Sequence, residues 1–284
     1  MSDNELGLFL RTRREAITPA QVGLPAGPRR RAPGLRRSEV AALAGVSVEY
    51  VTRLEQGRDR HPSPQILSAL ADALRLTTGE RTHLYTLTKA ADPGFNCRGG
   101  AAPARTVRPT VQALLQRFEG TPAVLVNELG DVVAHTATYA RLVGPIGLLD
   151  AAAPNLARFV FTDPRARDAY PDWEHVADEQ VATLKHGPFT GDPHMAALVD
   201  ELTVTAGDAF TQRVANVPGF AKSTGIVRLA HPEVGPLRLA YEVLDLPADD
   251  QLQLIVQLPA DDATAAALDR LVVDRSQPLH LVVG

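Results

Sequence analysis

The chain has 284 residues, of which 45% are hydrophobic and 22% charged, and its formal net charge is −4. That length is enough for two domains of ~150 residues each, and the composition is that of a globular protein. No apolar run approaches the ~20 residues that span a bilayer, and the N-terminal sequence lacks a signal peptide's apolar stretch. The lone cysteine, Cys97, excludes a disulfide framework and a cysteine-based zinc site. We therefore expect a cytoplasmic protein that does not associate with membranes.

Charge is unevenly distributed along the chain. Residues 1–90 contain 14 Lys and Arg against 9 Asp and Glu, whereas residues 91–284 contain 15 against 24. A basic first third on an acidic body is typical of a head that binds a polyanion. An unevenly charged solvated surface would give the same counts, so charge alone does not decide between the two.

The first third of the chain predicts an all-helical domain. An apolar stripe predicts a helix over 5–17, and the four prolines and three glycines that follow predict a loop over 18–35. A Ser-Pro pair and a second stripe predict a helix over 63–76, and a further helix is expected over 77–91.

Between these elements, segment 36–58 has the pattern of a helix-turn-helix motif. The pattern comprises a short helix with a small residue at the crossing point, a glycine turn, a capping residue and a second helix with inward apolar positions. The positions that carry it are Val40, Ala41, Ala44, Gly45, Val46, Ser47, Val51 and Leu54. Two ordinary packed helices are the alternative, and the agreement of so many constrained positions argues against it.

A helix-turn-helix places its second helix in the major groove and reads bases from the first turns of that helix. There an arginine pairs with guanine, a glutamate accepts from cytosine, and an apolar or aromatic side chain contacts a thymine methyl group. Nearby arginines would contact phosphates, although for the loop arginines a solvated basic surface is the alternative. The residues predicted to contact DNA are Arg29, Arg30, Arg31, Arg36, Arg37, Ser47, Val48, Glu49, Tyr50, Thr52, Arg53 and Arg58.

The second part of the chain has a different texture. Residues 92–109, rich in Gly, Pro and Ala, predict a linker between a DNA-binding domain over 1–91 and a second domain over 110–284. The second domain reads as two strands, a helical middle, three further strands and a final helix. This order predicts an α+β domain with an antiparallel sheet and helices packed on one face.

Several stretches resemble one family of bacterial regulators. The N-terminal ones are "LGLFLRTRR", "RRAPGLRRSEVAALAGVS", "YVTRLEQGR" and "PSPQILSALADALRL". They are similar to Xre-type, lambda-repressor-like helix-turn-helix domains of the actinobacterial subgroup that carries an MmyB-like ligand-binding domain. The C-terminal matches are "FTDPRARDAYPDWEHVADEQVATLK", "LVDELTV" followed by "AF", and "HPEVGPLRL". The resemblance implies a double-stranded DNA operator, a PAS-like second domain and a small apolar ligand such as a fatty acid.

The chain departs from the family pattern at three places. His135 and Thr136 stand where the family usually has Trp-Asn, and Pro154 and Asn155 where it usually has Arg-Asn. Val214 stands where an aromatic residue is common. If these positions shape the cavity, the ligand differs from that of the family or the cavity is filled.

Five residues are candidates for the lining of a ligand cavity, which a sheet covered by helices can enclose. They are Trp173, Leu184, Phe210, His231 and Tyr241. Core packing is the alternative for the apolar ones, and turn geometry is the alternative for the histidine.

The chain has no nucleophile elbow, phosphate-binding loop, dinucleotide fingerprint or HExxH motif. His175 and Glu179 are spaced to share a helix face, where a surface contact is favoured over a metal site. We therefore expect no enzyme activity, no cofactor and no metal.

These observations predict a DNA-binding transcription regulator that senses a small ligand. We expect a homodimer, because one such head buries little DNA and two half-sites one turn apart multiply affinity. The alternative is a ligand-free second domain that serves dimerisation or protein interaction. A DNA-binding head fused to an enzyme is opposed by the lack of catalytic motifs.

Overall fold

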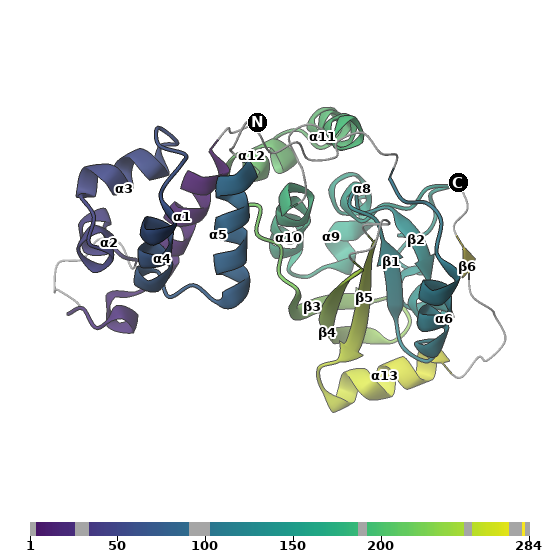
Figure 1. Ribbon diagram of the computed structural model, residues 1–284. Helices are drawn as coiled ribbons and strands as arrows, with labels where there is room; N and C mark the ends of the chain where they lie inside the picture. Colours follow the sequence, from purple (N-terminus) through teal and green to yellow (C-terminus); the bar gives the residue numbers. More distant parts are fainter. Residues whose placement is uncertain are drawn as a thin grey trace. The chain divides into compact units, whose positions relative to one another are not determined.

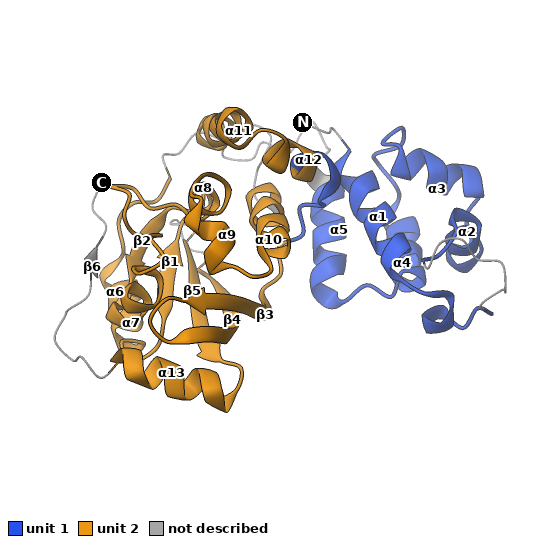
Figure 2. Ribbon diagram, turned by 180° about the vertical axis from the view of Figure 1, so that it is seen from behind, with its two compact units in different colours: residues 1–97, 214–220 blue, residues 98–213, 221–284 orange. Residues whose placement is uncertain are grey.

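The computed structural model describes residues 4–25, 34–90, 103–186, 192–246, 252–272 and 280–281. The chain divides into two compact units (Figure 2). Unit 1 comprises residues 1–97 and 214–220, and unit 2 comprises residues 98–213 and 221–284. No sequence pattern indicates that a segment from far along the chain belongs to the first unit.

The described part of unit 1 is helical, as predicted (Figure 1). Its α-helices are α1 (Glu5–Ala16), α2 (Arg37–Ala44), α3 (Val48–Glu55), α4 (Pro64–Ala73) and α5 (Thr78–Ala90). A short 3₁₀ turn, η1 (Pro19–Val22), lies in the segment that was expected to be loop throughout. Pro19 is its first residue, where the fixed φ of proline suits a helical turn.

Side-chain caps define where these helices begin. The Asn4 carboxamide accepts from the Gly7 N–H at 3.1 Å, and the Ser63 hydroxyl accepts from the Ile66 N–H at 3.4 Å. Each cap satisfies a backbone donor that the helix itself leaves unpaired. The helices then close over a buried core that includes Phe9, Leu54, Leu70, Leu74 and Leu84.

Segment 214–220 completes the packing of unit 1. The Phe220 ring lies 6.0 Å from the Phe9 ring and 5.3 Å from the His83 ring, measured between centroids. The Gly219 N–H donates to the Glu5 carboxylate at 3.2 Å. The same core therefore joins residues more than two hundred positions apart in sequence.

Unit 2 combines a sheet with helices (Figure 1). Its strands are β1 (Ala123–Val126), β2 (Val132–His135), β3 (Thr224–His231), β4 (Gly235–Leu246), β5 (Leu252–Pro259) and β6 (His280–Leu281). Its helices are α6 (Pro109–Arg117), α7 (Ala137–Val143), α8 (Leu156–Thr162), α9 (Arg165–Ala169), α10 (Trp173–His186), α11 (Pro193–Ala206), α12 (Asp208–Asn216, whose end enters unit 1) and α13 (Asp262–Val272).

The strands pair in the order β3-β4-β5-β1-β2-β6, with every pair antiparallel. The predicted α+β class with an antiparallel sheet is confirmed. Tyr241 of β4 lies opposite Gly225 of β3 and Gln257 of β5, so these three residues share a row across the sheet. Tyr241 and Gln257 of this row line the pocket described below.

Helices cover both faces of the sheet, so the prediction of helices on one face is wrong. On one face, side chains of α7, α8, α10 and α13 join the larger core with strand residues such as Val124 and Leu239. On the other, Val111 and Leu115 of α6 pack against Leu125 and Leu254. Helix α6 begins at the proline taken as the end of the linker, and its short stripe carries too few apolar residues to stand out in the sequence.

Candidate DNA-binding and ligand-binding sites

The helix-turn-helix geometry is built by local signals. Gly45 has φ of 66°, the left-handed conformation that ends α2 without steric cost. The Ser47 hydroxyl then accepts from the Tyr50 N–H at 3.0 Å and caps α3. Val51 and Leu54 are buried and face the core that α2 shares. The predicted turn, cap and inward residues are confirmed.

Helix α3 presents a polar face opposite its buried one. Val48, Glu49 and Arg53 are exposed and Thr52 is half-buried, and all four lie on adjacent turns. The Thr52 hydroxyl donates to the Val48 carbonyl at 2.8 Å, whereas the Arg53 guanidinium is only loosely held by Asp59 at 3.4 Å. An exposed ion pair of this length holds the Arg53 side chain only weakly.

Tyr50 lies at the border of that face and is half-buried. Burial raises the pKa of its phenol, the Asp59 carboxylate raises it further, and Arg53 lowers it. The ring is therefore neutral at physiological pH and offers a hydroxyl and an apolar edge.

A buried carboxylate fixes the position of α3. Glu55, with 2% of its side chain exposed, accepts from Arg14 at 2.5 and 3.1 Å and from Arg37 at 2.8 Å. Arg14 also donates to the Leu35 carbonyl at 2.9 Å, and the Asn4 carboxamide donates to the Glu55 carbonyl at 2.8 Å. Burial lowers the pKa of Arg14, but its bonds to Glu55 outweigh that effect and raise it overall. The network ties α1, α2 and α3 together.

The arginines predicted to contact phosphate occupy different positions. Arg36 and Arg58 are exposed, and Arg36 directly precedes the first turn of α2. Arg37 is shared: its guanidinium holds Glu55, yet 42% of its side chain is exposed. The loop arginines Arg29, Arg30 and Arg31 lie outside the described residues.

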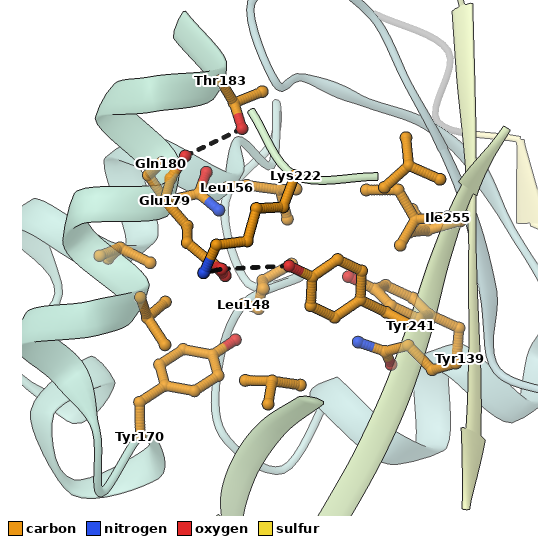
Figure 3. A pocket seen from close by; sticks show the side chains of 16 residues that line it. Tyr139, Leu148, Leu156, Tyr170, Glu179, Gln180, Thr183, Lys222, Tyr241 and Ile255 are labelled. Carbon is orange, nitrogen blue, oxygen red and sulfur yellow. Dashed lines mark hydrogen bonds and ion pairs between the residues drawn. The ribbon is translucent and has the colours of Figure 1, made fainter. Parts of the chain in front are cut away.

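Unit 2 contains a cavity of about 130 Å³ between the sheet and helices α8 and α10 (Figure 3). Aliphatic side chains, mostly from β1, β3, β4, β5, α8 and α10, account for half of its lining residues. The polar residues that matter for its chemistry are Tyr139, Tyr170, Glu179, Lys222, Tyr241 and Gln257.

An ion-pair cluster forms one side of this pocket (Figure 3). The Glu179 carboxylate accepts from the Tyr241 hydroxyl at 3.1 Å and pairs with the Lys222 ammonium at 3.3 Å. His175 approaches the same carboxylate at 3.2 Å, and Lys222 is half exposed, so the cluster lies at the solvent-facing rim. Burial, followed by the Glu179 charge, raises the pKa of the Tyr241 phenol.

Gly225 makes room for the rim tyrosine. A Cβ atom at position 225 would lie only 2.7 Å from the Tyr241 hydroxyl, because the phenol lies across this glycine on the neighbouring strand. The glycine therefore lets the ring reach Glu179. The absence of a side chain at position 225 thus permits the hydrogen bond between Tyr241 and Glu179 at the pocket rim.

Comparison with known proteins settles the family. The model of the MmyB-like transcription regulator ligand binding domain matches residues 107–271, more than half of the chain. The chain belongs to the MmyB-like transcription regulators. A helix-turn-helix domain model matches residues 5–84 of this MmyB-like regulator. The search of curated proteins found no match to the chain. It is thus a DNA-binding regulator with a ligand-binding C-terminal domain, and both families are regulatory rather than enzymatic.

Of the five residues predicted to line the regulator's cavity, only Tyr241 does so. Trp173 is buried in the core, where its indole N–H donates to the Val160 carbonyl at 2.9 Å. Phe210 and Leu184 are also fully buried. His231 accepts from the backbone N–H of the next turn, at 3.2 and 3.3 Å, which is the turn role given as its alternative.

The positions that depart from the family pattern serve other structural roles. Thr136 caps α7, and Asn155 caps α8 while its amide donates to Asp131 at 2.7 Å. His135 is buried beside Tyr139, and Val214 is buried within unit 1. None of them lines the 130 Å³ pocket among the described residues.

Pro154 borders a second, larger hollow of about 420 Å³ in unit 2. Three of its charged groups interact with one another: Arg158 makes two bonds of 2.7 and 2.8 Å with Glu201 and lies 3.5 Å from Asp131, while Arg105 and His194 also line the hollow.

Sequence reasoning missed Tyr139, Tyr170, Lys222 and Gln257 in the pocket. For Gln257 a signal existed, since strand alternation places it on the face of Ile255, opposite the apolar row of Leu254 and Val256. The others come from separate helices and loops, so no sequence spacing relates them.

The described residues contain no group of three or more His, Cys, Asp or Glu side chains that could hold a metal ion. Within the same part of the chain, no helix combines the length and apolarity needed to cross a bilayer.

Proposed function

We propose that this MmyB-like regulator binds a specific double-stranded DNA operator as a homodimer and that a small, largely apolar ligand in unit 2 modulates that binding. The observation that carries the proposal is the polar face of α3, held at a fixed angle by the buried Glu55 network. A reading helix must be rigidly presented if a few side chains are to discriminate bases.

The exposed residues divide into two roles. Glu49 and Arg53 are suited to reading base edges, with Val48, Tyr50 and Thr52 contributing apolar or hydroxyl contacts. Ser47, at the start of α3, and the exposed arginines that flank the motif are suited to phosphates. These assignments rest on exposure and chemistry.

The first experiment selects an operator from random duplex DNA and measures its affinity for single variants. Replacing Arg53 by alanine is expected to weaken operator binding by about 1–3 kcal/mol and to relax the base preference at one position. Replacing Arg36 by alanine is expected to weaken binding to all sequences and to lower the salt slope by about one unit. Wild-type affinity in both variants would refute the proposed interface.

Dimerisation is supported by an exposed apolar row on the α6 face of the sheet, beyond the strand residues that α6 covers. Ile226, Ala240 and Leu258 lie side by side on three adjacent strands, and the two larger ones are 50% and 47% exposed. A second copy of the chain is the proposed occupant, since helix-turn-helix proteins bind paired half-sites.

The dimer is tested by light scattering on size-exclusion fractions. Leu258→Glu is expected to give a monomer whose operator affinity falls at least tenfold. Val204→Glu is the matched control, because Val204 is an exposed apolar residue on α11, outside this row. A Leu258→Glu dimer with unchanged affinity would exclude this face.

A segment of the chain connects ligand occupancy to the DNA-binding unit in this proposal. Phe220 packs in unit 1, and Lys222, two residues later, lines the pocket of unit 2. A ligand that moves Lys222 would act on a chain segment anchored in unit 1. Ligand can change operator affinity only if it binds the two conformations differently, so operator titrations with and without ligand test the point.

The alternative is a second domain that binds no ligand and only dimerises or docks partners. The substituted family positions favoured it, but they lie outside the pocket. The pocket itself, with unspent polar groups on an apolar wall, favours a ligand.

A further inference from the structure

We infer that the pocket takes a compact, neutral, single-ring molecule with a hydroxyl or carbonyl oxygen, and that it rejects fatty acids and other carboxylates. The inference rests on the proposed function, which makes this pocket the sensor. It replaces the apolar acid implied by the family resemblance with a different chemical class.

Size is the first constraint. The cavity has about 130 Å³. A protein cavity of about 150 Å³ holds one benzene molecule, whereas drug-sized ligands occupy about 300–1,000 Å³. A long acyl chain has more than twice as many carbon atoms as benzene, so the cavity fits one ring with one or two small substituents.

Unspent hydrogen-bonding groups are the second constraint. Among the described residues, neither the Tyr139 nor the Tyr170 hydroxyl has a hydrogen-bond partner, and both side chains line the cavity. Figure 3 shows the Tyr170 hydroxyl pointing into it. The buried Gln257 Oε1 also has no partner in the described part of the chain. Buried polar groups are normally paired, so the ligand should bring an oxygen that accepts, donates or does both.

The protonation of the tyrosines is consistent with this role. Burial raises the pKa of Tyr170 to about 12 and raises that of Tyr139 above its ordinary value. Both phenols are therefore neutral at physiological pH and can donate to a ligand oxygen.

Charge is the third constraint. Of the described residues that line the cavity, only Glu179 and Lys222 are charged, and they pair with each other at the rim. A carboxylate deep in the pocket would have no cation, and burial of an unpaired charge is costly. A carboxylate at the rim would meet the Glu179 carboxylate beside Lys222. Neutral ligands avoid both problems.

Calorimetric titration of the full chain at pH 7 compares four probes: phenol, benzoate, octanoate and benzene. Phenol and benzoate share a ring and differ in charge, while benzene lacks the oxygen. We expect phenol to bind at least tenfold more tightly than either carboxylate and several-fold more tightly than benzene. Octanoate or benzoate binding as tightly as phenol would overturn the inference, as would a pocket that binds no ring and holds only water.

Three variants sharpen the assignment. Tyr170→Phe is expected to weaken phenol about tenfold, the ratio for one hydrogen bond of about 1.4 kcal/mol, and to leave benzene unchanged. Tyr85→Phe, on exposed helix surface, is the control and should change neither. Glu179→Gln should raise benzoate affinity at least fivefold by freeing Lys222. Unchanged phenol affinity in Tyr170→Phe, or unchanged benzoate affinity in Glu179→Gln, would contradict the proposed contacts.

Operator titration with saturating phenol separates this inference from the proposed function. Phenol binding without a change in operator affinity supports the ligand class and refutes sensing through this pocket. Modulation of operator binding by octanoate, with no phenol binding, supports sensing and overturns the ligand class.

Discussion

Two glutamates of this regulator collect several hydrogen-bond partners each, with opposite consequences. The Glu55 side chain in unit 1 is 2% exposed and binds the guanidinium groups of Arg14 and Arg37, which belong to helices α1 and α2. Glu179 in unit 2 is 24% exposed and holds an ammonium group and a phenol at a pocket rim. The carboxylate of the first cluster is shielded from solvent, whereas that of the second is partly open to it.

The difference matches what each unit has to do. Discrimination of bases needs side chains held in one geometry, whereas ligand entry needs a rim that opens. Breaking a buried ion pair leaves an uncompensated charge, while an exposed pair is worth little because water replaces the lost partner. Four perturbations test this difference between the two glutamate clusters.

The largest effect is expected from Glu55→Gln. It leaves buried Arg14 without its carboxylate and should lower the free energy of unfolding of unit 1 by about 3–5 kcal/mol. Denaturant unfolding measures the loss. Glu49→Gln, on the exposed face of the same helix, should change stability by less than about 0.5 kcal/mol. Equal effects of the two substitutions would remove the distinction between a fixed and an open cluster.

Alkaline pH should act on the pocket of unit 2. The pKa of Tyr170 is about 12 in the folded chain and ~10 in an unfolded one, so the unfolded state ionises first. The contribution of Tyr170 to the free energy of unfolding is complete below pH ~10 and is lost as the pH rises towards 12, on the order of 2–3 kcal/mol in all. Between pH 9 and 11, the free energy of unfolding measured in urea should decline less steeply in Tyr170→Phe than in the wild type. The remaining decline would come in part from Tyr139. Identical slopes would argue against a buried phenol.

A smaller effect is expected from Gly225→Ala. The new methyl group pushes the Tyr241 phenol off Glu179 and costs about 0.5–1.5 kcal/mol, the net value of one hydrogen bond. Tyr241→Phe should reproduce this loss, and the double variant should add little to either. Additive losses would mean that Gly225 acts through something other than Tyr241.

The smallest effect on stability is expected from Glu179→Gln. Its partners are partly exposed, so unfolding should change by less than about 1 kcal/mol. The ratio of this value to that of Glu55→Gln quantifies the difference between the two clusters. A loss as large as that of Glu55→Gln would mean that the rim is as fixed as the core of unit 1.

The sequence predicted the helix-turn-helix closely because its determinants are local. Gly45, Ser47 and the inward residues of α3 act within a few positions of one another, so each constraint can be read from the chain directly. Ser63 with Pro64 is a similar local signal for α4. In the same way, the strand alternation and turn residues of unit 2 predicted its principal strands.

The pocket could not be predicted to the same degree. Tyr139, Tyr170 and Gln257 come from α7, the end of α9 and β5, and only the tertiary fold brings them together. Trp173 and Phe210 were attractive candidates because they are large and aromatic, but those properties suit core packing equally well. Helix α6 was missed because a short helix beginning at a proline resembles the end of a linker.

Segment 214–220 has a consequence for how such regulators can be recombined. Phe220 lies against Phe9 and His83. A polypeptide that ends in the linker would therefore form a first unit in which these two side chains lose the ring that packs on them. Exchange of the DNA-binding head for another would also leave Phe220 facing a foreign surface. A functional hybrid should therefore carry residues 1–97 and residues 214–220 from the same parent, because both belong to unit 1.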